Sequence, residues 1–72
     1  MKNNEWRQVG GNQFEEEVVE LPGRHIWISD GVMGYSRPLA EGETVEEAGA
    51  DFELGGETVE EYRLYQDGER VE

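Results

Sequence analysis

The sequence has 72 residues, 35% of them hydrophobic, no cysteine, and a formal net charge of −12 at pH 7. A chain of this length builds one small domain with a thin core, so we expect a single domain over residues 1–72 that gains stability from a partner or a homodimer. The lack of a long apolar run, and of an apolar segment after Met1, predicts a cytoplasmic protein with no membrane partner, and the negative charge argues against direct attraction to nucleic acid.

The first forty residues predict mainly strands and turns. Residues 5–9 form a short mixed segment, residues 10–12 read Gly-Gly-Asn and predict a turn, and residues 13–21 carry several apolar side chains. We expect the two flanking segments to pair as a hairpin across the glycines. The spacing of Phe14 and Val18 and the run of three glutamates between them also suit a helix, so this alternative stays open.

Residues 25–29, His-Ile-Trp-Ile-Ser, are the clearest predicted strand. They are rich in residues that favour strands and are bounded by Pro22-Gly23 and Asp30-Gly31, which predict turns. Residues 32–36 are expected to return as the hairpin partner. Arg37-Pro38 should then break any regular element, because proline lacks the backbone N–H.

A hexapeptide, Gly-Glu-Thr-Val-Glu-Glu, occurs twice, at residues 42–47 and 56–61. Threonine can accept a hydrogen bond from the backbone N–H three residues on while the glutamate there reaches back, so each copy predicts the capping box that begins a helix. The two capping pairs would be Thr44 with Glu47 and Thr58 with Glu61.

Behind the first copy, an apolar stripe at helical spacing predicts a helix that ends at Gly55, where glycine can adopt the left-handed conformation. The residues of the stripe are Val45, Ala48, Gly49 and Phe52.

Residues 58–66 fit either a helix or a strand, and the second capping box tips the prediction slightly toward the helix. Asp67-Gly68 is a strong signal for a two-residue hairpin, which would place Tyr65 opposite Arg70 and Leu64 opposite Val71. The predicted fold class is therefore α+β, in which a small antiparallel sheet of N-terminal strands packs against one or two short C-terminal helices.

Negative charge is concentrated in the second half of the chain. Residues 1–40 hold six acidic and four basic residues, a net charge of −2, whereas residues 41–72 hold twelve acidic and two basic residues, a net charge of −10. A net charge of magnitude ~2–8 keeps a whole small domain soluble, so this excess favours a surface that imitates the phosphates of nucleic acid and enters a basic groove of a partner. A solvated face or adaptation to high salt is the alternative explanation.

The predicted partner-binding residues are the acids of this half and two tyrosines that a small core cannot cover. They are Glu43, Glu46, Glu47, Asp51, Glu53, Glu57, Glu60, Glu61, Tyr35 and Tyr65. Trp27, in contrast, is the first expected core residue.

No catalytic residue, metal site or cofactor is predicted. His25 and Ser29 share one face of the expected strand, but no signature of an oriented base or an oxyanion site accompanies them. The consecutive glutamates Glu15, Glu16 and Glu17 point in different directions and lack the spacing of a calcium loop. We therefore expect a protein that is not an enzyme.

The chain resembles, over residues 25–65, the small VapB-type antitoxin family that was first known only as a domain of unknown function. The shared positions are Ile26, Ile28, Gly31-Val32-Met33-Gly34, Arg37-Pro38, residues 39–47, Asp51-Phe52, Leu54 and Val59-Glu60-Glu61. This resemblance implies a strand followed by a helix-turn-helix-like region and a partner of the PIN-type ribonuclease class. The chain lacks the Gly-Thr-Arg motif and further helix that the family has between the counterparts of Pro38 and Leu39.

The charge and the resemblance together predict an acidic inhibitor of a basic nucleic-acid-binding protein, either an antitoxin or a phage-type anti-defence protein such as an anti-CRISPR. The alternative is a helix-turn-helix transcriptional regulator, with residues 58–66 as the helix in the major groove. Electrostatics disfavour it, because the single arginine of that helix, Arg63, would be outnumbered by Glu57, Glu60 and Glu61.

Overall fold

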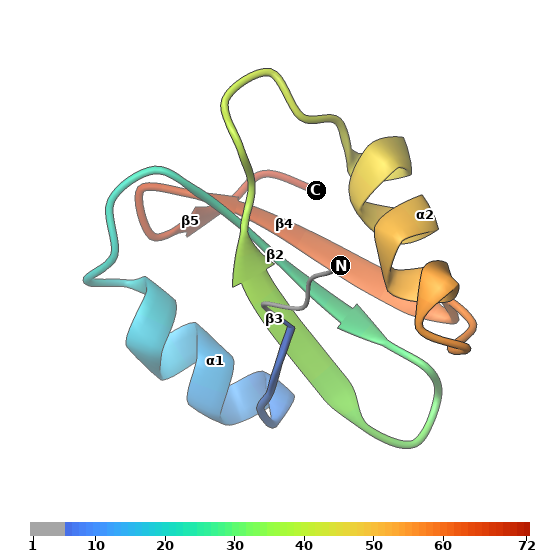
Figure 1. Ribbon diagram of the computed structural model, residues 1–72. Coiled ribbons are helices and arrows are strands. Elements are labelled where there is room, and N and C mark those ends of the chain that lie inside the picture. The colour runs from blue at the N-terminus through green and yellow to red at the C-terminus, as the bar shows by residue number, and fades with distance from the viewer. Residues whose placement is uncertain (1–5) are drawn as a thin grey trace.

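The structure is a computed structural model that describes residues 6–72, and it contains a five-stranded antiparallel sheet with a helix on each face (Figure 1). The elements in chain order are β1 (Arg7–Gln8), α1 (Gly11–Val18), β2 (Arg24–Ser29), β3 (Gly34–Pro38), α2 (Val45–Leu54), β4 (Glu61–Gln66) and β5 (Glu69–Arg70). The predicted α+β class with a small antiparallel sheet is confirmed. Residues 1–5, which include the start of the predicted segment 5–9, lie outside the described part.

The strands of both halves of the chain form one sheet in the order β1-β3-β2-β4-β5. On the central strand, Trp27 lies opposite Ser36 of β3 and Arg63 of β4. Helix α2 joins β3 to β4 and so passes over β2 (Figure 1). The predicted order of strands first and helices afterwards on one face is only partly confirmed: three strands precede α2, but α1 precedes β2 and two strands follow α2.

Side chains of β2 alternate between two separate cores, one under each helix. The α1 core contains Val9, Phe14, Val18, Trp27 and Tyr65, and the α2 core contains Ile26, Ile28, Ala48, Phe52 and Leu64. Both faces of β2 are covered, which explains why its sequence is apolar at consecutive positions. Trp27 is 6% exposed, so its predicted place in the core is confirmed.

The predicted strand over residues 13–21 is wrong, and the helical alternative holds. Phe14 and Val18 lie one turn apart on α1, and both are buried against the sheet. Two of the exposed glutamates between them pair with arginines of the sheet, Glu15 with Arg63 and Glu17 with Arg7. The strand β1 consequently pairs with β3 rather than with residues 13–21.

The return strand begins and ends two residues later than predicted. Asp30 accepts hydrogen bonds from the backbone N–H groups of Val32 (2.9 Å) and Met33 (2.8 Å), which removes these residues from the ladder. Arg37 and Pro38, predicted to break the structure, are instead the last residues of β3. The backbone N–H of Leu39 reaches β2, so the nitrogen of Pro38 faces the opposite edge, beyond the residues that β1 pairs.

The two copies of the hexapeptide adopt different structures. In the first, Thr44 and Glu47 form the predicted capping box, with the Glu47 N–H donating to Thr44 Oγ1 at 3.1 Å and the Thr44 N–H donating to Glu47 Oε1 at 2.9 Å. Helix α2 then runs to Leu54 with Gly55 as its C-cap, but Gly56, not Gly55, has the left-handed conformation, with φ of 96°.

The second copy leads into β4, so the predicted helix over residues 58–66 is wrong. Tyr62 to Tyr65 pair with β2 along their whole length, and this ladder and the burial of Leu64 and Tyr65 outweigh a local cap. The predicted hairpin is confirmed, because Asp67 and Gly68 both have positive φ and Tyr65 lies opposite Arg70.

The different structures of the two copies predict different costs for one substitution. Thr44→Ala removes a helix cap and is expected to lower the free energy of unfolding by about 1 kcal/mol. Thr58→Ala, at the matching position of the second copy, removes an exposed hydroxyl that caps no helix and should change stability little. Urea unfolding of both variants checks this, and equal losses would contradict the assignment of β4.

Candidate functional site

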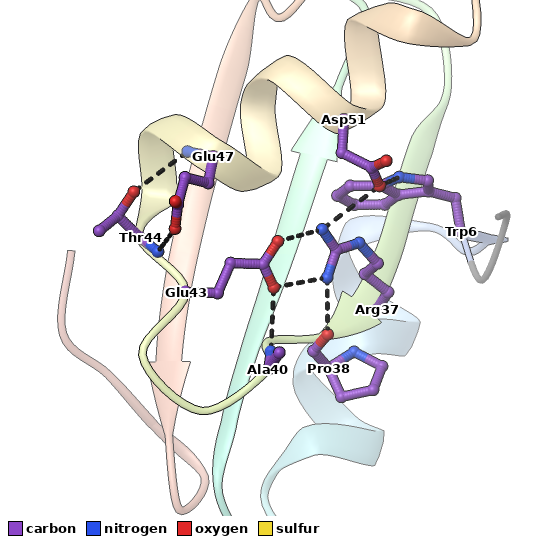
Figure 2. Close-up of polar contacts among 8 residues, drawn as sticks. All are labelled: Trp6, Arg37, Pro38, Ala40, Glu43, Thr44, Glu47 and Asp51. Atoms are coloured by element: carbon purple, nitrogen blue, oxygen red, sulfur yellow. Dashed lines mark hydrogen bonds and ion pairs between the residues drawn. The ribbon is translucent and has the colours of Figure 1, made fainter. Parts of the chain in front are cut away.

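Arg37, near the end of β3, is the centre of a polar cluster that connects β3 with α2, with the loop between them and with Trp6 (Figure 2). Its guanidinium donates two parallel hydrogen bonds to Glu43, from Nη1 at 2.9 Å and Nη2 at 2.6 Å. It also lies 3.3 Å from Asp51 of α2 and stacks 4.8 Å from the centre of the Trp6 ring. Trp6 completes the cluster by donating its indole N–H to Asp51 at 2.9 Å.

The cluster is largely shielded from water, since the side chains of Arg37 and Glu43 are 10% and 16% exposed. Hydrogen bonds from Arg37 lower the pKa of Glu43 to about 2, and the Ala40 backbone N–H adds to this effect. Glu43 and Asp51 were both predicted to contact a partner. In the structure both side chains pair with Arg37 and so connect the loop before α2, and α2 itself, to β3.

A second arginine plays the same part on the other face of the sheet. Arg63 of β4 stacks 4.3 Å from the centre of the Trp27 ring and pairs with Glu15 of α1 at 3.2 Å and with Glu61 at 3.5 Å. The hydroxyl of Tyr65 donates to the same carboxylate of Glu15 at 2.8 Å. Arg63, which a DNA-binding helix would have pointed at phosphate, is thus turned toward α1.

The eight predicted acids therefore divide into two groups. Glu43, Glu47, Asp51 and Glu61 are engaged within the domain, as a helix cap or as partners of an arginine. The other four make no ion pair with a described residue: Glu46, Glu53 and Glu60, which are exposed, and Glu57, which is partly buried.

Glu57 lies against another carboxylate, that of Asp30 in the turn between β2 and β3. Backbone N–H groups of Met33 and Val32 lower the pKa of Asp30, whereas the hydrogen bond shared with Asp30 raises the pKa of Glu57. The side chain of Glu60 packs beside Gly31 of the same turn. This end of the sheet therefore brings Asp30, Glu57 and Glu60 together, and the nearby negative charge raises the pKa of Glu57.

Carboxylates without an ion pair are found in both halves of the chain, whereas the sequence predicted them only in residues 41–72. Within residues 6–72, five further exposed glutamates make no ion pair with a described residue, namely Glu16, Glu20, Glu41, Glu69 and Glu72. Two of them lie on or next to α1, on the opposite face from α2. The negative surface thus covers both sides of the molecule.

The two predicted tyrosines are less exposed than a binding anchor needs. Tyr65 is 3% exposed and belongs to the α1 core, so it is not available to a partner. Tyr35 is half-buried and packs 5.5 Å from Phe52, ring centre to ring centre. The exposed tyrosine is Tyr62, at 38%, which sequence reasoning placed on a helix. Tyr62 stands two residues before the buried Leu64, and this alternation is the pattern that indicates a strand.

His25 and Ser29 of β2 form no hydrogen bond with each other. Ser29 Oγ accepts a hydrogen bond from the Gly31 N–H at 3.0 Å, and Nδ1 of His25 has no hydrogen-bond partner. The described residues contain no group of three or more His, Asp or Glu side chains that could hold a metal ion, and no helix long and apolar enough to cross a membrane.

Comparison with known proteins gives no relative: no family model, no curated protein and no solved structure matches the chain. The resemblance to VapB-type antitoxins thus stays a prediction that rests on the residues alone.

Proposed function

We propose that the protein is a non-catalytic inhibitor that binds a basic, nucleic-acid-binding partner and blocks the surface which that partner uses for DNA or RNA. An antitoxin directed at a nuclease and a phage anti-defence protein of the anti-CRISPR type are the two forms of this function. The free carboxylates would occupy the positions that phosphates take in the partner's groove.

The observation that carries the proposal is that unpaired carboxylates outnumber unpaired arginines among the described residues. Arg7, Arg37 and Arg63 pair with carboxylates of the domain and only Arg24 and Arg70 make no such pair, whereas exposed glutamates on both helices and at the Asp30–Glu57 end have no described counter-charge. Such a surface repels nucleic acid and speeds association with a positively charged protein. A cation from the partner placed beside Glu57 would also relieve its repulsion from Asp30.

The experiment is a pull-down of the tagged protein from its host lysate at low salt, followed by elution with a salt gradient and mass spectrometry. The proposal predicts a basic nuclease or nucleic-acid-binding effector in the eluate. If the protein retains only nucleic acid, or if the recovered proteins are not basic, the proposal is wrong.

Binding to the recovered partner should depend steeply on ionic strength. Raising the salt from low concentration to about 0.3 M shortens the Debye length below 10 Å and should weaken the complex at least ~10-fold, mainly through slower association. Surface plasmon resonance at several salt concentrations measures both rates. Affinity that is insensitive to salt would point to an apolar interface and would contradict the electrostatic mechanism.

The DNA-binding regulator loses its structural basis as a helix-turn-helix protein, because residues 61–66 form a central part of the sheet. A gel shift with random and operator-region DNA still provides a direct check. Retention of DNA at moderate salt would revive the regulator and contradict the inhibitor.

A further inference from the structure

An open groove runs between α2 and the start of β4. Its volume is about 340 Å³, and its apolar lining comes from Val45, Gly49 and Ala50 of α2, from Val59 and from Tyr62. Glu46 and Glu53 also line it. From this geometry we infer that the groove receives an apolar side chain from a basic amphipathic segment of the partner, with a lysine or arginine on each side of that side chain; this rests on the proposed function.

The positions of the two glutamates fit such a segment. Glu46, Gly49, Ala50 and Glu53 follow each other at helical spacing, so the glutamates stand at the two ends of one strip of α2, ~10 Å apart along the axis, with the two smallest side chains between them. A Cβ atom on Gly49 would meet only Val59 across the groove, at 3.8 Å. The middle of the groove is therefore open and apolar, and its ends are acidic.

Tyr62 supplies a fixed wall. Its hydroxyl donates to Glu72 at 2.9 Å, which holds the ring in place while 38% of the residue stays exposed. That hydrogen bond and the charge of Glu72 raise the pKa of Tyr62, and the charge of Glu46, which lines the groove, adds to this effect. An aromatic wall beside carboxylates favours the aliphatic stem and charged end of lysine or arginine.

Charge selects this occupant over the others. A second copy of the chain, with a net charge of −12, would bring more negative charge to the glutamates of the groove, and nucleic acid would be repelled for the same reason. An apolar segment without cations would leave Glu46 and Glu53 beside a dry interface with no counter-charge. Only a segment that is both apolar and basic satisfies the lining and both ends.

Two synthetic peptides of equal positive charge test the inference by NMR titration and calorimetry at low salt. One carries lysines with leucines along one helical face, and the other has serine in place of each leucine. The leucine peptide is expected to bind at least ~10-fold more tightly, because it buries apolar surface in the groove, and to shift the amide signals of Gly49, Ala50 and Val59 most.

Matched variants separate the groove from the general negative charge. Ala50→Phe, at an exposed position of α2, fills the groove and should reduce affinity for the leucine peptide at least ~5-fold. Asn12→Phe, at an exposed position of α1, should leave this affinity unchanged. Glu46→Gln with Glu53→Gln should weaken binding more than Glu16→Gln with Glu20→Gln, although both pairs remove the same charge.

The outcomes distinguish the two proposals. If both peptides bind equally well and shift signals over α1 and α2 alike, the groove is not the docking site and only the general electrostatic proposal survives. If neither peptide binds at low salt, both the groove and the electrostatic basis of the proposed function are wrong.

Discussion

Replacing Glu43 by glutamine is expected to lower the free energy of unfolding by about 3 kcal/mol at pH 7, because it leaves a buried arginine without its main counter-charge. Arg37 is 10% exposed, and its two hydrogen bonds to Glu43, at 2.9 and 2.6 Å, need both carboxylate oxygens. A glutamine offers one oxygen and no charge, and Asp51, at 3.3 Å, compensates only in part. Urea unfolding followed by tryptophan fluorescence measures the loss.

The loss should disappear in acid. The pKa of Glu43 is about 2 in the folded state, below its usual 4.5. A carboxyl with a lowered pKa contributes stability above its unfolded pKa, and this contribution is lost as the pH falls through the folded value. The gap between the wild type and Glu43→Gln should therefore be full above about pH 5 and close toward pH 2. The other carboxylates protonate in both proteins, so their effect on stability cancels in the difference between the wild type and Glu43→Gln.

Glu41→Gln is the matched control for this measurement. It removes the same charge two residues away, at an exposed position with no described ion pair, so its stability should stay close to that of the wild type at every pH. A gap for Glu43→Gln that is the same at pH 7 and pH 3, or no larger than that for Glu41→Gln, would show that the Arg37 cluster does not stabilise the fold.

Gly34→Ala is expected to lower the free energy of unfolding by about 2–3 kcal/mol, because the Trp27 indole packs directly against this glycine. A Cβ atom at position 34 would stand 2.5 Å from Trp27 Nε1 and 2.6 Å from Cζ2. Two contacts oppose a shift of the indole. Arg63 stacks 4.3 Å from the centre of the Trp27 ring, and the Trp27 indole N–H donates to the Val9 carbonyl at 3.3 Å. A lower midpoint of urea unfolding and a weaker near-ultraviolet circular dichroism signal of Trp27 would report the strain.

Gly49→Ala provides the contrast for Gly34→Ala. A Cβ atom there meets only Val59, at 3.8 Å, and an alanine within α2 should raise the free energy of unfolding by about 0.5–1 kcal/mol. If both alanines have the same effect, the packing of Trp27 against Gly34 is not what decides stability at that position.

The elements that could be predicted from the sequence are those that local interactions decide. The capping box of α2 needs only Thr44 and Glu47, and the hairpin at Asp67-Gly68 needs only the conformations of two residues. The strand at residues 25–29 was clear because it is buried on both faces. Each of these signals lies within a few residues of the structure that it determines.

The elements that were missed depend on contacts distant in the sequence. The two copies of the hexapeptide are identical, and the second leads into a strand because the residues from Glu61 onward form a ladder with β2, more than thirty residues earlier. The helix α1 is favoured over a strand because Phe14 meets Tyr65 and Glu15 meets Arg63, which the sequence alone does not place together.

The candidate surface was predicted in kind but not in detail. Composition shows that acids are in excess, and this follows from counting. Which acids remain free depends on where the arginines lie, since Asp51 pairs with Arg37 and Glu15 with Arg63 only through the folded sheet. The groove beside Tyr62 was missed for the same reason, because it is formed by α2 and a segment that was expected to be helical.

Displacement of nucleic acid from the partner tests most directly whether this protein blocks the surface that the partner uses for DNA or RNA. The partner recovered from the lysate is bound to a labelled oligonucleotide, and this protein is titrated into the complex at low and at high salt while fluorescence anisotropy is followed. We expect stoichiometric release of the oligonucleotide at low salt and weaker release at high salt. A stable ternary complex, in which this protein binds while the oligonucleotide stays in place, would contradict it.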